Sequence, residues 1–149
     1  MNKSEKYAHS LDQIRALIKG ETDLISNLSN IAAVLKENHG FFWAGFYLVK
    51  DGQLVLGPFQ GPVACTRIEK NKGVCGKAWA ENKSLLVPNV HEFPGHIACN
   101  ENSKSEVVIP VADRSDNVSM VLDVDHDEFN FFDTEISIVI RKNRFKFIR

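Results

Sequence analysis

The apolar positions of the first 40 residues recur every three or four residues, which is the spacing of an amphipathic helix. They fall into two sets, one before Gly20 and one after Asp23. The residues between these sets have the composition of a helix end followed by a new N-cap. The pattern therefore predicts two helices within residues 6–38, the second of which is closed by Gly40.

From residue 41 the pattern changes to short runs of β-branched and aromatic residues, which are typical of strands. Asp51 and Gly52 separate the first two runs, and an Asp-Gly pair favours a tight hairpin. The same composition predicts further strands at residues 63–68, 84–88, 106–111 and 119–124. Helices are expected at 73–82 and 133–149, and residues 88–105 form a long polar loop of the kind that often carries function. This order predicts helices packed on an antiparallel sheet.

Length and charge limit the class of protein. A chain of 149 residues fits one domain, which we expect to span 1–149. The net charge of −1 gives no reason to expect a nucleic acid or a membrane surface as partner. The basic residues within 141–149 are expected to form a solvated face. No apolar run reaches the roughly 20 residues of a transmembrane helix, and the first residues lack a signal segment, so we expect a cytoplasmic location.

Three cysteines are the residues best suited to carry chemistry. The odd number of Cys65, Cys75 and Cys99, and their lack of C-x-x-C spacing, leave catalysis, metal binding and core packing open. Cys75 lies at the expected start of a helix, where the helix dipole would stabilise a thiolate. Cys99 lies in the long loop, three residues after His96. With His91, these residues include enough soft ligands for zinc, but they lack the closely spaced cysteines of structural zinc sites.

Acidic residues near strand ends offer a second half of a site. Asp123 and Asp125 are two residues apart, so their side chains should project from the same face of a strand. Two carboxyl groups this close should raise the pKa of at least one of them. Two hydrated aspartates at a strand end are the alternative, and Glu106 has the same two interpretations. Trp43 and Tyr47 share one strand face and fit either a core or a ligand wall.

Five stretches of the chain together match a known family. They are 43–47 (WAGFY), 73–76 (GVCG), 90–99 (VHEFPGHIAC), 103–110 (SKSEVVIP) and 121–125 (VLDVD). This set resembles free methionine-(R)-sulfoxide reductase, most strongly over residues 41–126. The resemblance implies an α/β (α+β) fold of the GAF type, with a six-stranded antiparallel sheet flanked by helices. Met120 stands where the family usually has a glycine, and we expect it to affect the pocket floor.

The resemblance also implies a role for each candidate residue. It identifies Cys99 as the nucleophile, Cys65 as the resolving cysteine and Cys75 as a supporting or alternative resolving cysteine. The residues that correspond to the substrate pocket are Trp43, Tyr47, Glu106, Asp123 and Asp125. In the implied reaction Cys99 becomes a sulfenic acid, a Cys65–Cys99 disulfide forms, and thioredoxin or a similar dithiol restores the thiols.

Some alternatives stay open on the sequence. The reaction needs no metal, nucleotide or flavin, so no cofactor is expected. Either Asp125 or Glu106 could donate the proton to the sulfoxide oxygen. A GAF module that binds a small ligand or senses redox state without turnover is the competing class of protein. The sequence leaves a homodimer open.

Overall fold

The computed structural model describes residues 1–143 of the chain. One sheet contains six strands in the order β3-β2-β1-β6-β5-β4, and every neighbouring pair is antiparallel. The strands are β1 (Trp43–Lys50), β2 (Gln53–Gln60), β3 (Arg67–Glu69), β4 (Leu85–Val87), β5 (Ser105–Ala112) and β6 (Val118–His126). The helices are α1 (Lys3–Ile18), α2 (Leu24–His39), α3 (Gly73–Glu81), α4 (Thr134–Asn143) and the 3₁₀ turn η1 (Val90–Glu92). The predicted fold class is confirmed.

Local capping explains the helix boundaries. The Asp23 side chain accepts a hydrogen bond from the Ser26 backbone N–H at 2.8 Å and starts α2. Gly40 ends α2 with a φ of 64°, a left-handed conformation that favours glycine. The first helix begins at Lys3, earlier than predicted, because Asn2 and Glu5 form a capping box. None of the helices in residues 1–143 is long and apolar enough to cross a membrane.

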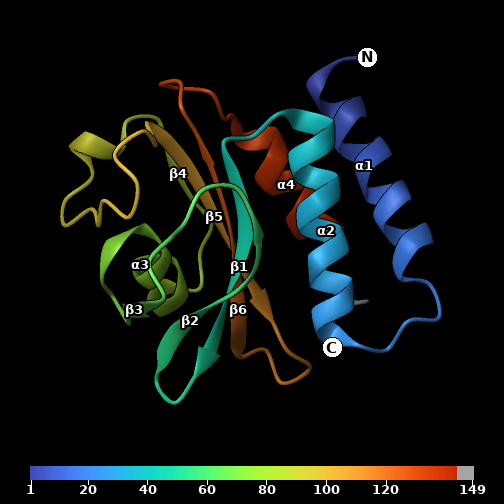
Figure 1. The fold of residues 1–149 in the computed structure, drawn as a ribbon, viewed down its shortest axis with the longest axis horizontal. Coiled ribbons are helices and arrows are strands. Elements are labelled where there is room, and N and C mark those ends of the chain that lie inside the picture. Colours follow the sequence, from blue (N-terminus) through green and yellow to red (C-terminus); the bar gives the residue numbers. More distant parts are fainter. Residues whose placement is uncertain (144–149) are drawn as a thin grey trace.

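The two faces of the sheet have separate cores (Figure 1). Helices α1, α2 and α4 lie on one side, while α3 and the long loop before β5 lie on the other. Strand β1 sends Phe46 and Leu48 into the core beneath the helices. It sends Trp43 and Tyr47 to the opposite face, as their spacing predicted. The face toward α3 therefore receives the candidate site residues of β1.

Alternation in β6 separates an apolar row from an acidic row. Leu122 and Val124 are fully buried on the side of α1, α2 and α4. Asp123 and Asp125 project to the other side, where both line a cavity. Met120 belongs to the apolar row and is 3% exposed. The expectation that Met120 affects the pocket floor is wrong, because its side chain lies on the opposite face of the sheet.

The predicted strand at 63–68 is mostly a loop, since β3 contains only Arg67–Glu69. Hydrogen bonds from the sheet face explain this difference. The Trp43 indole N–H donates to the Pro62 carbonyl at 3.0 Å, and the Tyr47 hydroxyl donates to the Cys65 carbonyl at 2.9 Å. These carbonyls are bound to side chains rather than to a neighbouring strand. The loop therefore lies over the sheet and carries Cys65 above it.

The predicted last helix is confirmed over Thr134–Asn143. Arg141 is exposed, as expected for the basic face. The rest of that predicted helix and basic face, residues 144–149, lies outside the described residues.

Candidate active site

Two of the three cysteines are joined. Cys65, in the loop between β2 and β3, forms a disulfide with Cys99, in the loop before β5. Their Cα atoms are 5.3 Å apart, and 34 positions separate them in sequence. This is the pair that the family resemblance implies. Both residues are half-buried, so the disulfide lies at the boundary between the fold and solvent.

A cavity opens on the α3 side of the sheet, beside this disulfide. Its lining includes all the predicted site residues apart from Cys65, namely Trp43, Tyr47, Cys75, Cys99, Glu106, Asp123 and Asp125. They come from β1, α3, the long loop, β5 and β6, which are far apart in the sequence. The cavity therefore combines one sulfur of the disulfide, an aromatic wall and a group of carboxyl groups.

The aromatic wall is a stack on β1 and β2. Trp43 lies between Phe59 and Tyr47, with ring centroids at 5.2 Å and 6.0 Å. Gly45 makes this packing possible, because a Cβ there would lie 2.3 Å from the Phe59 Cβ. Burial, helped by the nearby carboxyl groups, raises the pKa of the Tyr47 phenol. The phenol therefore stays protonated and holds the carbonyl of Cys65.

The carboxyl groups meet where β5 pairs with β6. Glu106 is the direct partner of Asp125 in this ladder, and Asp123 lies two residues along the same face. Burial raises the pKa of Asp123 and of Asp125 well above the ordinary range. The charges of Asp125 and Glu106 raise the pKa of Asp123 further, and the charge of Glu106 raises that of Asp125. The predicted rise is therefore confirmed, because two or three negative charges cannot be held this close in a buried site.

Asp123 and Asp125 differ in their hydrogen bonds. The Ser103 hydroxyl donates to Asp125 Oδ1 at 2.8 Å. Asp123 is 6% exposed, and its Oδ1 is buried with no hydrogen-bond partner within residues 1–143. A buried acceptor without a partner is costly, so this oxygen is suited to receive a donor from a bound molecule.

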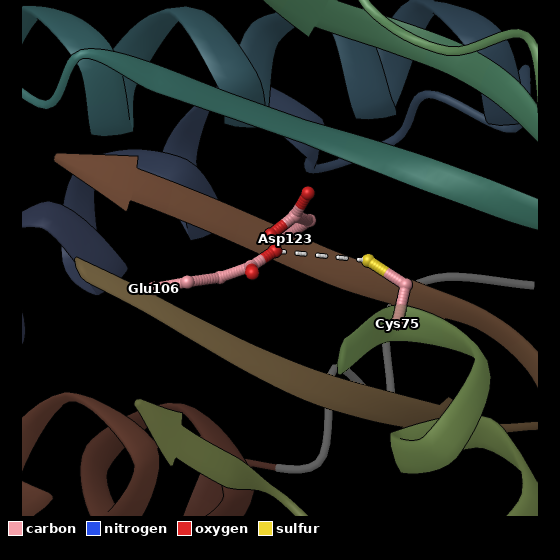
Figure 2. A group of neighbouring side chains, drawn as sticks. All are labelled: Cys75, Glu106 and Asp123. Atoms are coloured by element: carbon pink, nitrogen blue, oxygen red, sulfur yellow. Dashed lines mark hydrogen bonds between the residues drawn. The ribbon is translucent and has the colours of Figure 1, made fainter. Parts of the chain in front are cut away.

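Cys75 lies beside Glu106 and Asp123 (Figure 2). Its thiol on α3 is 4.0 Å from Glu106 Oε2. The prediction that the helix dipole stabilises a thiolate here is wrong. Burial raises the pKa of Cys75 well above its ordinary value, and the charges of Asp123 and Glu106 raise it further. Cys75 therefore remains a protonated thiol, outside the disulfide.

The zinc ligand set considered from the sequence is not assembled, because Cys65 and Cys99 are bonded to each other. Within residues 1–143, the group that could hold a metal ion consists of Cys75, Glu106 and Asp123, whose ligand atoms lie within 4.8 Å of one another. A metal would have to displace protons from groups whose pKa is raised. The same acids are equally suited to a cationic ammonium group.

Sequence reasoning gave Ser103 no role, although it belongs to one of the stretches that carry the resemblance. Its hydroxyl contacts Asp125 across 22 positions of sequence. Such a contact depends on how the long loop folds back onto β6, so no local sequence pattern predicts it. The buried position of Ser103, 8% exposed, was likewise not predictable from a polar loop.

Comparisons with known proteins agree with this geometry, although no family model matches the chain. GAF domain-containing protein A of Dictyostelium discoideum is 55% identical over 133 residues, which cover 89% of this chain and 84% of that protein. The six-stranded sheet with its flanking helices is therefore that of a GAF domain, here with a cysteine pair at its cavity.

Two further proteins narrow this class. Free methionine-R-sulfoxide reductase of Escherichia coli is 46% identical over 136 residues, covering 91% of this chain and 82% of that protein. The X-ray structure of free methionine-R-sulfoxide reductase from Neisseria meningitidis in complex with its substrate has a TM-score of 0.94 and 42% identity, and the match covers 100% of this chain and 93% of that chain. The chain belongs to the free methionine-R-sulfoxide reductase family of oxidoreductases.

Proposed function

We propose that this protein reduces free methionine (R)-sulfoxide to methionine with its own thiols. The observation that carries the proposal is the Cys65–Cys99 pair beside a cavity with three carboxyl groups. Membership of the reductase family supports the same substrate and the same R stereochemistry. The reaction requires only a nucleophile, a proton donor and an external dithiol.

In the proposed first step the Cys99 thiolate attacks the sulfoxide sulfur. A sulfoxide oxygen leaves poorly unless it is protonated, so an acid must act at the same time. We assign this role to Asp125, because its pKa is raised and it lines the same cavity as Cys99. The oxygen passes to Cys99, which becomes a sulfenic acid, and methionine leaves as the reduced sulfide.

The second step makes the disulfide. The Cys65 thiol attacks the sulfenic sulfur of Cys99, water leaves, and the S–S bond forms. A dithiol such as thioredoxin then reduces this bond by thiol–disulfide exchange. Thioredoxin as the partner and a cytoplasmic location stay predictions, as do a possible homodimer and a single domain over 1–149.

Substrate choice would depend on the ammonium group of the free amino acid. Glu106 and Asp123 lie on one face of the sheet, and the unpartnered Oδ1 of Asp123 would accept a hydrogen bond from that ammonium. The bound cation would also favour the ionised form of Asp123, whose pKa is otherwise raised. Trp43 would contribute an apolar surface for the substrate methyl group.

Cysteine variants test the division of labour. Cys99→Ser should abolish turnover, because a hydroxyl does not supply a thiolate-like nucleophile at neutral pH. Cys65→Ser should release about one methionine per chain and then stall with thioredoxin, since Cys65 acts only after the sulfenic acid forms. Chromatography of the released methionine measures both results, and a stall after one turnover in Cys75→Ser would instead support the alternative resolving role of Cys75. Loss of the first turnover in Cys65→Ser would place Cys65 in the chemical step.

Acetylation of the substrate tests ammonium recognition. N-acetyl-methionine sulfoxide has no cationic group, and leaving a buried carboxylate without its partner costs about 2–5 kcal/mol. Even the lower figure predicts roughly a thirtyfold fall in kcat/KM. Glu106→Gln and Asp123→Asn should each reduce the difference in kcat/KM between the free and the acetylated substrate. Equal use of both substrates by the wild type would contradict ammonium recognition, and binding without turnover of either would favour the ligand-sensing alternative.

A further inference from the structure

Two exposed apolar side chains flank the disulfide. Val63 is 85% exposed and Ile97 is 39% exposed. Each lies two positions before a cysteine of the pair and is followed by an alanine, in the segments 63–65 (VAC) and 97–99 (IAC). Single exposed apolar residues are ordinary on protein surfaces. Here, however, each of the two loop segments that the disulfide joins carries one of them, at the same distance from its cysteine.

The fold holds both side chains in these positions. On one side, the Trp43 and Tyr47 side chains bind the carbonyls of Pro62 and Cys65, on either side of Val63. The backbone that carries Val63 is therefore fixed while its side chain remains in solvent.

On the other side, Ile97 rests on the start of α3. A Cβ added at Gly73 would lie 3.2 Å from Ile97 Cδ1, so glycine leaves just enough room for this contact. The inner part of Ile97 is thus packed and its outer part is exposed. Val63 and Ile97, with Ala64 and Ala98, are called the disulfide rim below.

We propose that the disulfide rim is the docking surface for a protein dithiol that reduces Cys65–Cys99. This inference rests on the proposed function, in which the disulfide must be reduced once per cycle. A thiolate of the partner attacks one sulfur of the disulfide, forms a mixed disulfide and releases the other sulfur as a thiolate. The second partner thiol then attacks the mixed disulfide, so the partner becomes oxidised and both Cys65 and Cys99 become reduced.

The rim suits a transient protein partner in particular. Redox encounters bury small interfaces, so a few apolar side chains around the reacting sulfurs can contribute much of the contact. Burying Val63 and Ile97 against a partner also removes apolar surface from water, which favours association. A small dithiol has no surface to place there, so its rate should not depend on the rim.

The experiment measures reduction of the oxidised protein without any sulfoxide. The second-order rate constant for reduction by reduced thioredoxin is compared with that for dithiothreitol, using thiol trapping and mass spectrometry. Val63→Ser should lower the thioredoxin rate constant about fivefold, and Val63→Ser with Ile97→Ser should lower it further. Ile25→Ser on α2, which removes an equally apolar residue that is 51% exposed on the helix side, should change neither rate.

The rates with the two reductants distinguish the outcomes. An unchanged thioredoxin rate in the double variant would overturn the docking surface. A parallel fall with dithiothreitol would also overturn it, because the rim would then act on the disulfide itself. Failure of thioredoxin to reduce the wild type would remove this partner and the rim together. Sulfoxide turnover driven by dithiothreitol would still test the proposed function separately.

Discussion

At the scale of single residues, Asp123 and Asp125 differ in their hydrogen bonds, and this difference suits them to different proposed roles. Burial raises the pKa of both. The hydrogen bond from Ser103 favours the ionised form of Asp125 and moderates that rise, whereas Asp123 Oδ1 has no such partner within the described residues. Asp125 is therefore protonated more readily than an exposed aspartate, which suits the proposed role of proton donor. In the proposed function, the Oδ1 of Asp123 would accept a hydrogen bond from the substrate ammonium group.

Removing the Ser103 hydroxyl should therefore change the pH profile. Ser103→Ala takes away a donor to ionised Asp125, so the pKa of Asp125 should rise further. A proton donor must be protonated to act, so the basic limb of kcat/KM should move to higher pH. Loss of an orienting hydrogen bond worth about 1 kcal/mol should lower kcat about fivefold. Steady-state kinetics between about pH 6 and pH 10, measured about every half pH unit, would resolve the shift of the basic limb and the fall in kcat.

Ser103→Thr is the matched control, because it keeps the hydroxyl and should restore the wild-type limb. A shift of the acidic limb to higher pH in Ser103→Ala would contradict the assignment of Asp125 as proton donor. Asp125 would then act in its ionised form, as a ligand for the ammonium group, and Glu106 would be the proton donor.

At the scale of elements, local signals predicted most boundaries, whereas contacts across the sheet decided the exceptions. Asp23 and Gly40 cap α2 by short-range bonds, which a sequence displays directly. The strand predicted at 63–68 is wrong over residues 63–66, because this loop is held by hydrogen bonds from Trp43 and Tyr47, which are remote in sequence. Met120 was misplaced although the alternation with Leu122 and Val124 already indicated its face.

The same distinction applies to the site. The projection of Asp123 and Asp125 from one face of a strand followed from strand geometry alone. The pairing of Cys65 with Cys99 came only from family resemblance, because loop paths cannot be deduced from spacing. Cys75 shows the limit of a local argument, since its position near a helix start favours a thiolate but its burial among acids favours the thiol.

The interface between α1 and the C-terminal end of α2 contains a half-buried histidine that should make stability depend on pH. His39 packs between Tyr7 and Phe41, with ring centroids at 4.9 Å and 5.1 Å. Its Nε2 is 2.9 Å from the Ser10 hydroxyl. Burial, and then the charge of Lys6, lower the pKa of His39 from 6.5 to about 4. The neutral ring is therefore the form that fits between the helices.

Stability should fall as the pH drops from 6.5 to 4, because the unfolded state then binds a proton that the folded state does not. With a discount for partial exposure, we expect the His39 contribution to fall by about 1–3 kcal/mol over this window. His39→Gln should remove this contribution. The free energy of unfolding of the variant should then differ less between pH 7.5 and pH 4.5 than that of the wild type, by about 1–3 kcal/mol. Urea unfolding at both values measures it, and an equal loss in both proteins would contradict the role of His39.

At the scale of the whole molecule, the sheet keeps the candidate active site on one of its two faces. The face toward α1, α2 and α4 has a continuous apolar core that includes Phe41, Phe46 and Ile136, all fully buried. The opposite face carries the carboxyl groups, the free thiol and the disulfide. Buried acids and unpartnered acceptors destabilise a fold. The apolar cores on the two faces of the sheet therefore have to offset the cost of this site.

The redox cycle should consequently be visible in global stability. The Cys65–Cys99 bond closes a loop that contains β3, α3, β4 and η1, with a sequence separation of 34. In the chain-entropy description, a loop of this size restricts the unfolded chain by about 3–4 kcal/mol. The oxidised protein should therefore unfold at higher urea concentration than the reduced protein, with a smaller slope because its unfolded chain is more compact. Cys65→Ser should show no such response to a phosphine reductant.

Equal midpoints for the oxidised and reduced wild type would mean that native interactions lost on oxidation offset the loop closure. The enzyme would then pass through its cycle without a change in stability.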